Sequence, residues 1–238
     1  MTDLSYAIAA EVFERFPGYV RGIVLAHGVR NGPSPAPLLA LLRGAEEAAR
    51  ARLTVEKLAE EPRIAAWRDA FRRFGAKPSD YRPSIEALLR RVLKGQELPA
   101  ISALVDIGNL VSLRHLLPTG SHAIDTLTGD IALRPATGAE SFVPFGAEAV
   151  EHPSAGEIVF VEGETVLARR WIWRQANHTL TMPETTAVEF NVDGLPPASR
   201  AEVDAACRDV MALTAEFCGG GSRIEVLSRE NPRISLAR

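Results

Sequence analysis

The run VLARRWIWRQ, residues 166–175, gathers the side chains best suited to recognition chemistry. It holds two of the chain's three tryptophans together with three arginines. Aromatic planes beside guanidinium groups can stack on a nucleobase and bind its phosphate, or line a pocket for a carboxylate or an aromatic side chain. If the run is a strand, its side chains alternate between two faces. One face then carries Arg169, Trp171 and Trp173, and the other carries Arg170, Ile172 and Arg174.

The same run also suits a structural role, and this alternative stays open. One face can belong to the core while the arginines extend their charged ends to water. The arginines can also pair with acids such as Glu157, Glu162 or Glu164. For a functional role, we predict that Trp173 forms a pocket wall and that Arg174 is the functional cation.

The histidines, cysteines, glycines and serines exclude several familiar sites. The five histidines form no His-x-x-x-His motif, and two cysteines are too few for a four-thiolate metal site. Gly219–Gly221 lacks the Lys-Ser/Thr of a phosphate loop, and no serine stands in a Gly-x-Ser-x-Gly context. We expect no metal, no cofactor and no serine nucleophile. His122 follows a Thr-Gly-Ser turn, where it faces either a cleft or solvent.

Positive charge is concentrated in residues 68–94, which we call the basic segment, although the formal net charge of the chain is -3. The segment holds eight Lys or Arg residues against three acidic ones. Such a patch can face the phosphates of a nucleic acid, or it can form the solvated faces of two helices. The candidate RNA contacts are Arg72, Arg73, Lys77, Arg90, Arg91 and Lys94.

The elements before residue 100 are expected to be helices around one strand. Apolar spacing predicts a helix over residues 3–16, and a nearly continuous apolar run predicts a buried strand over residues 18–29. In a later helix, Ser84 can cap the start and Gly95 can end it. The other expected helical stretches are residues 37–60, 62–74 and 84–95.

From Gly129 the pattern changes to strands separated by Gly, Pro, Asn and Thr turns. A last helix runs to about Phe217, and Gly219–Gly221 ends it before a final strand. The order of helices, then strands, then a helix predicts an α+β fold. The expected strands are DIALRPA, ESFVPF, EIVFVEG, TVLARRWIWRQ, TTAVEFNV and RIEVLS.

Residues 98–118 are apolar apart from a few side chains, Asp106 and Asn109 among them. Burying such groups unpaired costs about 1–3 kcal/mol each, so both need partners. Asp106 suits a structural hydrogen bond or a cap. Asn109 suits either a turn or a donor in a pocket.

Residues 105–142, VDIGNLVSLRHLLPTGSHAIDTLTGDIALRPATGAESF, resemble the B3/B4 domain of the bacterial phenylalanyl-tRNA synthetase beta subunit. That domain carries the enzyme's editing site. The resemblance covers residues 70–195 and implies a mixed β-sandwich-like core flanked by helices. The matching features, in order, are Val-Asp-Ile-x-Asn at 105–109, His-Ala-Ile-Asp at 122–125, Gly-Asp-Ile-x-x-Arg at 129–134, Gly-x-Glu at 138–140, and Glu-Thr before an apolar strand at 184–190.

The resemblance implies roles for particular residues. His122 corresponds to the histidine of the editing pocket, and it would position the ester or a water together with Asn109. The family's recognition glutamate is replaced by Asn191, with Glu189 two residues earlier on the same strand face. The run 166–175 stands where the family has a Gly-Gly pair, so the amino-acid specificity does not carry over. The expected substrate contacts are Trp173, Arg174, Asp106, Glu189 and Asn191.

We expect one free-standing domain over 1–238, with parts 1–95, 96–195 and 196–238. The resemblance implies that it binds the tRNA acceptor end or an aminoacyl-tRNA and can hydrolyse a mischarged aminoacyl ester. One alternative is a non-catalytic module for a free amino acid or similar metabolite, and another is a protein-interaction domain with an exposed apolar patch. Early acidic residues and the lack of a long apolar run predict a cytoplasmic protein without a membrane partner.

Overall fold

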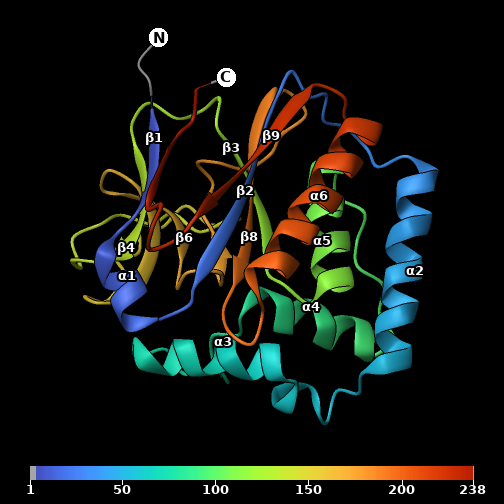
Figure 1. Ribbon diagram of the computed structural model, residues 1–238, viewed down its shortest axis with the longest axis horizontal. Helices are drawn as coiled ribbons and strands as arrows, with labels where there is room; N and C mark the ends of the chain where they lie inside the picture. The colour runs from blue at the N-terminus through green and yellow to red at the C-terminus, as the bar shows by residue number, and fades with distance from the viewer. Residues whose placement is uncertain (1–3, 238) are drawn as a thin grey trace.

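The computed structural model describes residues 4–237, which form two β-sheets with helices packed around them (Figure 1). The smaller sheet has four strands, and every neighbouring pair in it is antiparallel. The chain assembles this sheet from segments that lie far apart in the sequence. In sheet order the strands are β3 (Thr119–Ala123), β8 (Ala187–Gly194), β2 (Val20–His27) and β9 (Gly221–Leu227).

The larger sheet is mixed. Strand β1 runs parallel to β4, and all other neighbouring pairs in this sheet are antiparallel. In sheet order the strands are β10 (Arg233–Ser235), β1 (Ser5–Ile8), β4 (Ile131–Pro135), β5 (Ile158–Glu162), β6 (Thr165–Arg169) and β7 (Arg174–Gln175).

The helices cover the outer face of the four-stranded sheet and one end of the molecule. In Figure 1, α5 and α6 lie against that sheet, α2 lies outside α5, and α3 runs below. Within residues 4–237, no helix is both long and apolar enough to cross a membrane. The helices are α1 (Ala10–Arg15), α2 (Ala36–Arg52), α3 (Pro62–Arg73), α4 (Ser84–Leu93), α5 (Ala103–His115) and α6 (Arg200–Phe217), with a short 3-10 helix at Leu58–Glu60.

Close packing of α6 on β2 decides which side chains face the interior between the sheets. A Cβ atom on Gly22 would lie only 2.2 Å from the Cys207 sulfur of α6, so only glycine fits there. Val192 pairs with Gly22 and lies beside the same contact. Since side chains alternate along a strand, Arg21 and the paired Asp193 face the other way. There the two sheets meet, and this confirms the expected α+β sandwich-like core flanked by helices.

The predicted helix over residues 3–16 is wrong at its start, and residue 3 lies outside the described range. Residues Ser5–Ile8 form β1, and the helix covers only Ala10–Arg15. The strand is held by pairing with β4 and β10, more than a hundred residues away in sequence. Local apolar spacing cannot report such distant partners, and tertiary pairing overrides it.

The structure decides several other predictions about helix ends and strands. Ser84 does not cap α4, because Pro83 occupies the N-cap position and no side chain caps the helix. Gly95 does end it, with a φ of 78° that glycine adopts easily. ESFVPF forms isolated bridges, such as Phe142 with Glu151, instead of a strand. His122 does not follow a turn, because the preceding Thr-Gly-Ser belongs to β3. The strands predicted around β2, β4, β5, β8 and β9 are confirmed.

Candidate functional site

A pocket of about 230 Å³ lies where the two sheets and the 170–173 turn meet. The four-stranded sheet contributes His122 and Asn191, and the six-stranded sheet contributes Phe160 and Gln175. Trp173 lines it beside Arg174. The pocket therefore brings together four of the predicted site residues, namely His122, Trp173, Arg174 and Asn191.

His122 is held in one orientation by two neighbours that sequence reasoning did not find. Its Nδ1 lies 2.7 Å from the Thr179 hydroxyl and 3.3 Å from the Gln175 amide nitrogen. The Thr179 hydroxyl can donate or accept, and the Gln175 amide group also donates to the Ser121 and Thr179 carbonyls. With the Thr179 hydroxyl as the donor, we assign Nδ1 as the acceptor and the proton to Nε2. The imidazole packs edge-on against Phe160, with 5.0 Å between the ring centroids.

The protonation state of His122 follows from its burial. Burial, and then the nearby Arg21 charge, lower the pKa of His122 to about 3. Both causes disfavour the imidazolium form. At neutral pH the pocket therefore holds a neutral imidazole with an N–H donor at Nε2, rather than a cation.

Beneath the pocket lies a buried polar cluster that links both sheets. Arg21 donates two hydrogen bonds to Asp193, at 2.7 and 3.0 Å, and a third to the Tyr6 hydroxyl. Tyr19 also donates to Asp193. Burial alone would lower the pKa of Arg21, but the Asp193 carboxylate holds it well above its usual range. This cluster, defined as Tyr6, Tyr19, Arg21, Glu189, Asn191 and Asp193, fixes the floor of the pocket.

Glu189 supports the pocket from behind. It is fully buried and does not line the cavity. Its Oε1 accepts a hydrogen bond of 2.8 Å from Asn191, whose own Oδ1 accepts one of 3.1 Å from Tyr6. Burial raises the pKa of Glu189 to about 8. The carboxyl group is therefore largely protonated at neutral pH, and the contact that it makes orients the Asn191 amide.

The Trp/Arg run is not one continuous strand, so the predicted alternation of faces is wrong. Strand β6 ends at Arg169, and the chain then turns through Arg170 and Trp171, which have φ values of 48° and 65°. Left-handed backbone at two successive non-glycine residues is uncommon and gives no signal in the sequence. The turn buries Trp171 in the core, where it also lines the inner side of the pocket, and leaves Trp173 and Arg174 as less buried pocket residues.

Trp171 is a core residue, as the structural alternative predicts. Its indole makes edge contacts with Phe16, Tyr19 and Trp67, at centroid distances of 4.8, 4.8 and 5.0 Å. It donates a hydrogen bond of 3.3 Å from Nε1 to the Tyr19 hydroxyl. Trp171 therefore joins the turn to the buried polar cluster.

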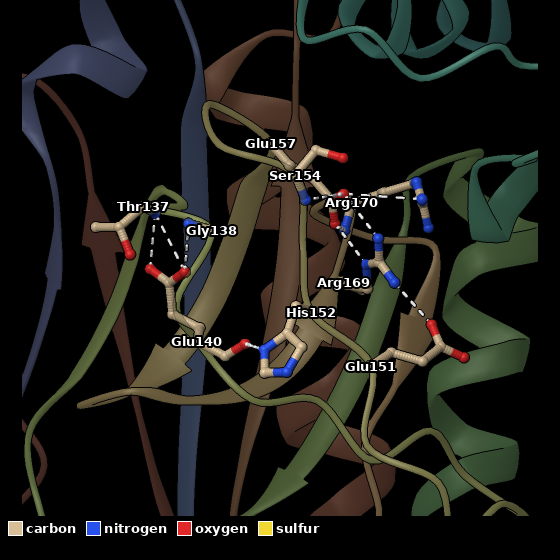
Figure 2. A network of polar contacts seen from close by, with 9 residues as sticks. All are labelled: Thr137, Gly138, Glu140, Glu151, His152, Ser154, Glu157, Arg169 and Arg170. Atoms are coloured by element: carbon tan, nitrogen blue, oxygen red, sulfur yellow. Dashed lines mark hydrogen bonds and ion pairs between the residues drawn. The ribbon is translucent and has the colours of Figure 1, made fainter.

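Acids hold Arg169 and Arg170 in place, as Figure 2 shows. Arg169 donates to Glu157 at 2.9 Å and to Glu151 at 2.7 Å. Arg170 lies 3.8 Å from Glu157 and packs against two rings, with its guanidinium carbon 3.5 Å from the Tyr81 centroid and 4.5 Å from that of Trp173. The structural alternative predicted that the arginines pair with acids. This is right for Glu157, which contacts both arginines, and wrong for Glu162 and Glu164.

Arg174 is the arginine of the run that remains available to bind a ligand. It is exposed and donates one hydrogen bond of 3.1 Å to the Phe145 carbonyl. Among residues 4–237 no carboxylate forms an ion pair with it. A cation in that state at the pocket mouth can meet an anionic group of a ligand.

Asp106 and Asn109 lie elsewhere. Both belong to α5, which packs on the helical side of the four-stranded sheet, and neither lines the pocket. The Asp106 carboxylate accepts a hydrogen bond of 2.6 Å from Ser34 and one of 3.2 Å from the Ile101 backbone N–H. Burial raises its pKa. Asp106 thus ties two loops to the start of α5, which is the structural role considered above.

Four of the eight cations in the basic segment pair with its three acids, so the segment keeps an excess of positive charge. Arg90 pairs at 2.9 Å with Glu86, a fully buried glutamate that also binds Arg68. Arg73 pairs with Asp69 at 2.9 Å, and Lys77 lies 4.0 Å from Asp80. Arg91 donates to the Glu97 carbonyl. Of the predicted RNA contacts, only Arg72 and Lys94 are exposed without a polar partner in residues 4–237.

The residues of the site that were not predicted include Arg21, Gln175, Thr179 and Asp193. Two sequence signals could have found the ion pair. Arg21 interrupts an apolar run assigned to a buried strand, so it needs a partner. Glu189, Asn191 and Asp193 recur at a spacing of two, which places three polar side chains on one strand face.

Within the described residues, no group of three His, Cys, Asp or Glu side chains is placed to hold a metal ion. The pocket offers a neutral imidazole donor, an oriented amide and an arginine at its mouth. These groups can bind and polarise a small polar ligand.

Comparison with known proteins agrees with the resemblance described from the sequence. A model of the B3/4 domain family matches residues 66–219. No curated protein matches the chain. A solved structure of an N-terminal fragment of the phenylalanyl-tRNA synthetase beta-subunit from Pyrococcus horikoshii is similar, with 13% identity and a TM-score of 0.47. The alignment covers 94% of this chain and 51% of that one, so the chain spans about half its length. Because the family match extends over more than half of its residues, the chain belongs to the B3/4 domain family.

Proposed function

We propose that the pocket between the sheets binds the aminoacyl group of an aminoacyl-tRNA and holds its ester for hydrolysis. The observation that carries this proposal is the neutral, oriented His122 beside Asn191 in a small cavity. Pockets for drug-sized ligands measure about 300–1,000 Å³. A volume of about 230 Å³ suits an amino acid side chain and its ester, with the nucleotide left outside.

The residues of the pocket suit ester hydrolysis without a covalent intermediate. An aminoacyl ester is already activated, so a positioned water and a donor for the carbonyl oxygen can suffice. His122 offers that donor at Nε2, because Thr179 and Gln175 occupy Nδ1. In this arrangement Asn191 orients the bound group, Trp173 forms a wall, and Arg174 meets a phosphate at the mouth.

The test is a deacylation assay on a panel of correctly charged and mischarged tRNAs. We expect selective hydrolysis by the wild-type protein, loss of it in His122→Ala, and a weaker effect in Arg174→Ala. His115→Ala is the matched control, because His115 also contacts a partner, Asp209 at 3.1 Å, but lies outside the pocket. If every charged tRNA were hydrolysed no faster with the protein than without it, the proposal would be contradicted.

A second candidate function is non-catalytic binding of a free amino acid. The pairing of Arg73, Lys77 and Arg90 with acids favours it, because a tRNA-binding surface needs cations that are free to meet phosphates. Titration calorimetry with free amino acids tests this candidate. Binding that is insensitive to salt, together with no deacylation and no binding of tRNA, would select it over the first.

A further inference from the structure

A second cavity, which we call the outer groove, lies at the ends of β5 and β6 and has a volume of about 730 Å³. It shares no lining residue with the His122 pocket. The two cavities nevertheless adjoin the same segment. Arg174 and Gln175 line the pocket, whereas Ala176, Asn177 and His178 line the groove. The groove is within the size range of sites for drug-sized ligands.

A glutamate–histidine pair stands in the wall of this groove. His178 Nε2 lies 2.6 Å from Glu162 Oε2. The other oxygen, Oε1, accepts from the backbone N–H groups of Thr128 and Gly129 at 2.5 and 2.6 Å, and from the Thr128 hydroxyl at 3.0 Å. Four donors thus converge on one carboxylate that is only 9% exposed.

This contact pattern determines which atom of His178 faces a ligand. Burial alone would raise the pKa of Glu162, but the hydrogen bonds from Thr128, His178 and Gly129 lower it, so the group stays ionised. An ionised carboxylate only accepts hydrogen bonds, so His178 donates from Nε2. Within residues 4–237, Nδ1 has no hydrogen-bond partner. The His178 side chain is 36% exposed and lines the groove, so it offers one unpaired ring nitrogen to a ligand.

The remaining lining indicates what kind of ligand fits. No Lys or Arg lines the groove, and its charged side chains are Glu162 and Asp130. Arg134 donates to the Gly163 carbonyl, but Glu140 neutralises its guanidinium. The groove therefore disfavours phosphates and carboxylates. The uncharged polar side chains of the groove are Thr128, Ser141, Thr165 and Asn177. Its apolar side chains are Val143, Val166 and Ala176.

We propose that the outer groove is a second binding site, which takes an uncharged, hydroxyl-bearing ligand of nucleoside or sugar size. One ligand hydroxyl forms a hydrogen bond with His178 Nδ1. The apolar side chains Val143, Val166 and Ala176 cover the flat face of a base or the apolar face of a sugar ring. The proposal is independent of the function assigned to the His122 pocket, because the two cavities have no residue in common.

The test is calorimetry with adenosine, ribose, glucose and adenosine monophosphate on the full chain. We expect adenosine or a sugar to bind, and the phosphorylated nucleoside to bind more weakly than adenosine. Adenosine alone would identify a nucleoside site, and glucose or ribose alone a sugar site. Absence of binding by adenosine and by both sugars at millimolar concentration would overturn the proposal.

Variants connect the binding to the Glu162–His178 pair. Loss of the hydrogen bond in His178→Ala should weaken binding about tenfold. Glu162→Gln keeps the shape but loses the charge-assisted contact, so a smaller loss is expected. His115→Ala should leave binding unchanged, because His115 lies outside both cavities. If His178→Ala does not fold, the imidazole NMR signals of His178 in the wild type must shift on binding, and unchanged signals would overturn the proposal.

Discussion

The buried polar cluster and the basic segment use arginines in opposite ways. Arg21 is 2% exposed and gives its donors to Asp193 and Tyr6, so one geometry is available to it. In the basic segment, exposed Arg73 and Lys77 pair with near neighbours in sequence, Asp69 and Asp80. The comparison teaches that clustering of charge in a sequence is a weak guide to a site. The isolated arginine inside an apolar strand is the one that supports the pocket.

The largest effect is expected when the acid of the buried Arg21–Asp193 pair is removed. Asp193→Ala leaves the Arg21 charge buried and unpaired, so we expect a loss of about 3–5 kcal/mol in the free energy of unfolding. Asp69→Ala breaks the exposed pair with Arg73 and should cost about 0–1 kcal/mol. Urea denaturation measures both. Equal losses in the two variants would show that burial does not set the difference.

The pH dependence of stability tests the same interior. The pKa of Glu189 is about 8 in the folded protein, above its ordinary value of 4.5. Between these values the folded state binds more protons than the unfolded state, so this group lowers stability as pH rises from about 4.5 to 8. The slope is at most about 1.4 kcal/mol per pH unit.

Glu189→Gln should remove that contribution while keeping an oxygen to accept from Asn191. Chemical denaturation at several pH values would then show the variant gaining on the wild type toward pH 8. A variant whose stability stays parallel to that of the wild type from pH 5 to 8 would mean that Glu189 titrates normally.

Within the basic segment, one arginine should matter more than its neighbours. Arg90 pairs with the fully buried Glu86, whereas Arg73 pairs with an exposed acid. Arg90→Ala should therefore cost about 1.5–3 kcal/mol, the range for hydrogen bonds to charged groups. Arg73→Ala should cost less than about 1 kcal/mol. Thermal unfolding of the two variants in parallel decides the order, and a greater loss in Arg73→Ala would reverse our reading of the segment.

The smallest expected effect concerns Arg72 and Lys94, the two predicted RNA contacts whose side chains have no polar partner in residues 4–237. If the proposed tRNA contact includes them, each alanine variant should reduce the slope of log K against log salt by about 0.7–0.9. Their stability should stay within about 0.5 kcal/mol of the wild type. Filter binding over a salt series measures the slope. An unchanged slope in both variants would exclude these two residues from the contact.

Local patterns predicted most of the elements, and long-range pairing explains the failures. The strands β2, β5 and β8 have apolar runs that identify them without knowledge of their partners. Strand β1 depends on β4 and β10, so its four residues read locally as helix. The break in the Trp/Arg run depends on two residues with left-handed backbone, and neither of them is a glycine that would mark the turn in the sequence.

The candidate site was predictable in part for the same reason. His122, Trp173, Arg174 and Asn191 could be named because their chemical types or the family resemblance marked them. The ion pair beneath them joins residues 172 positions apart. Asp106 and Asn109 match the family motif, yet the fold directs them away from the pocket. A single sequence shows which groups can react but not which of them meet.

The left-handed turn at Arg170 and Trp171 has a consequence for ligand affinity. Non-glycine residues in this conformation cost on the order of 1 kcal/mol or more each, and they persist only where their surroundings hold them. Here the three aromatic contacts of Trp171 and the carboxylate of Glu157 do so. The rim that carries Trp173 is therefore ordered before any ligand arrives. Binding then loses little conformational entropy at this edge, and more of the contact energy remains as affinity.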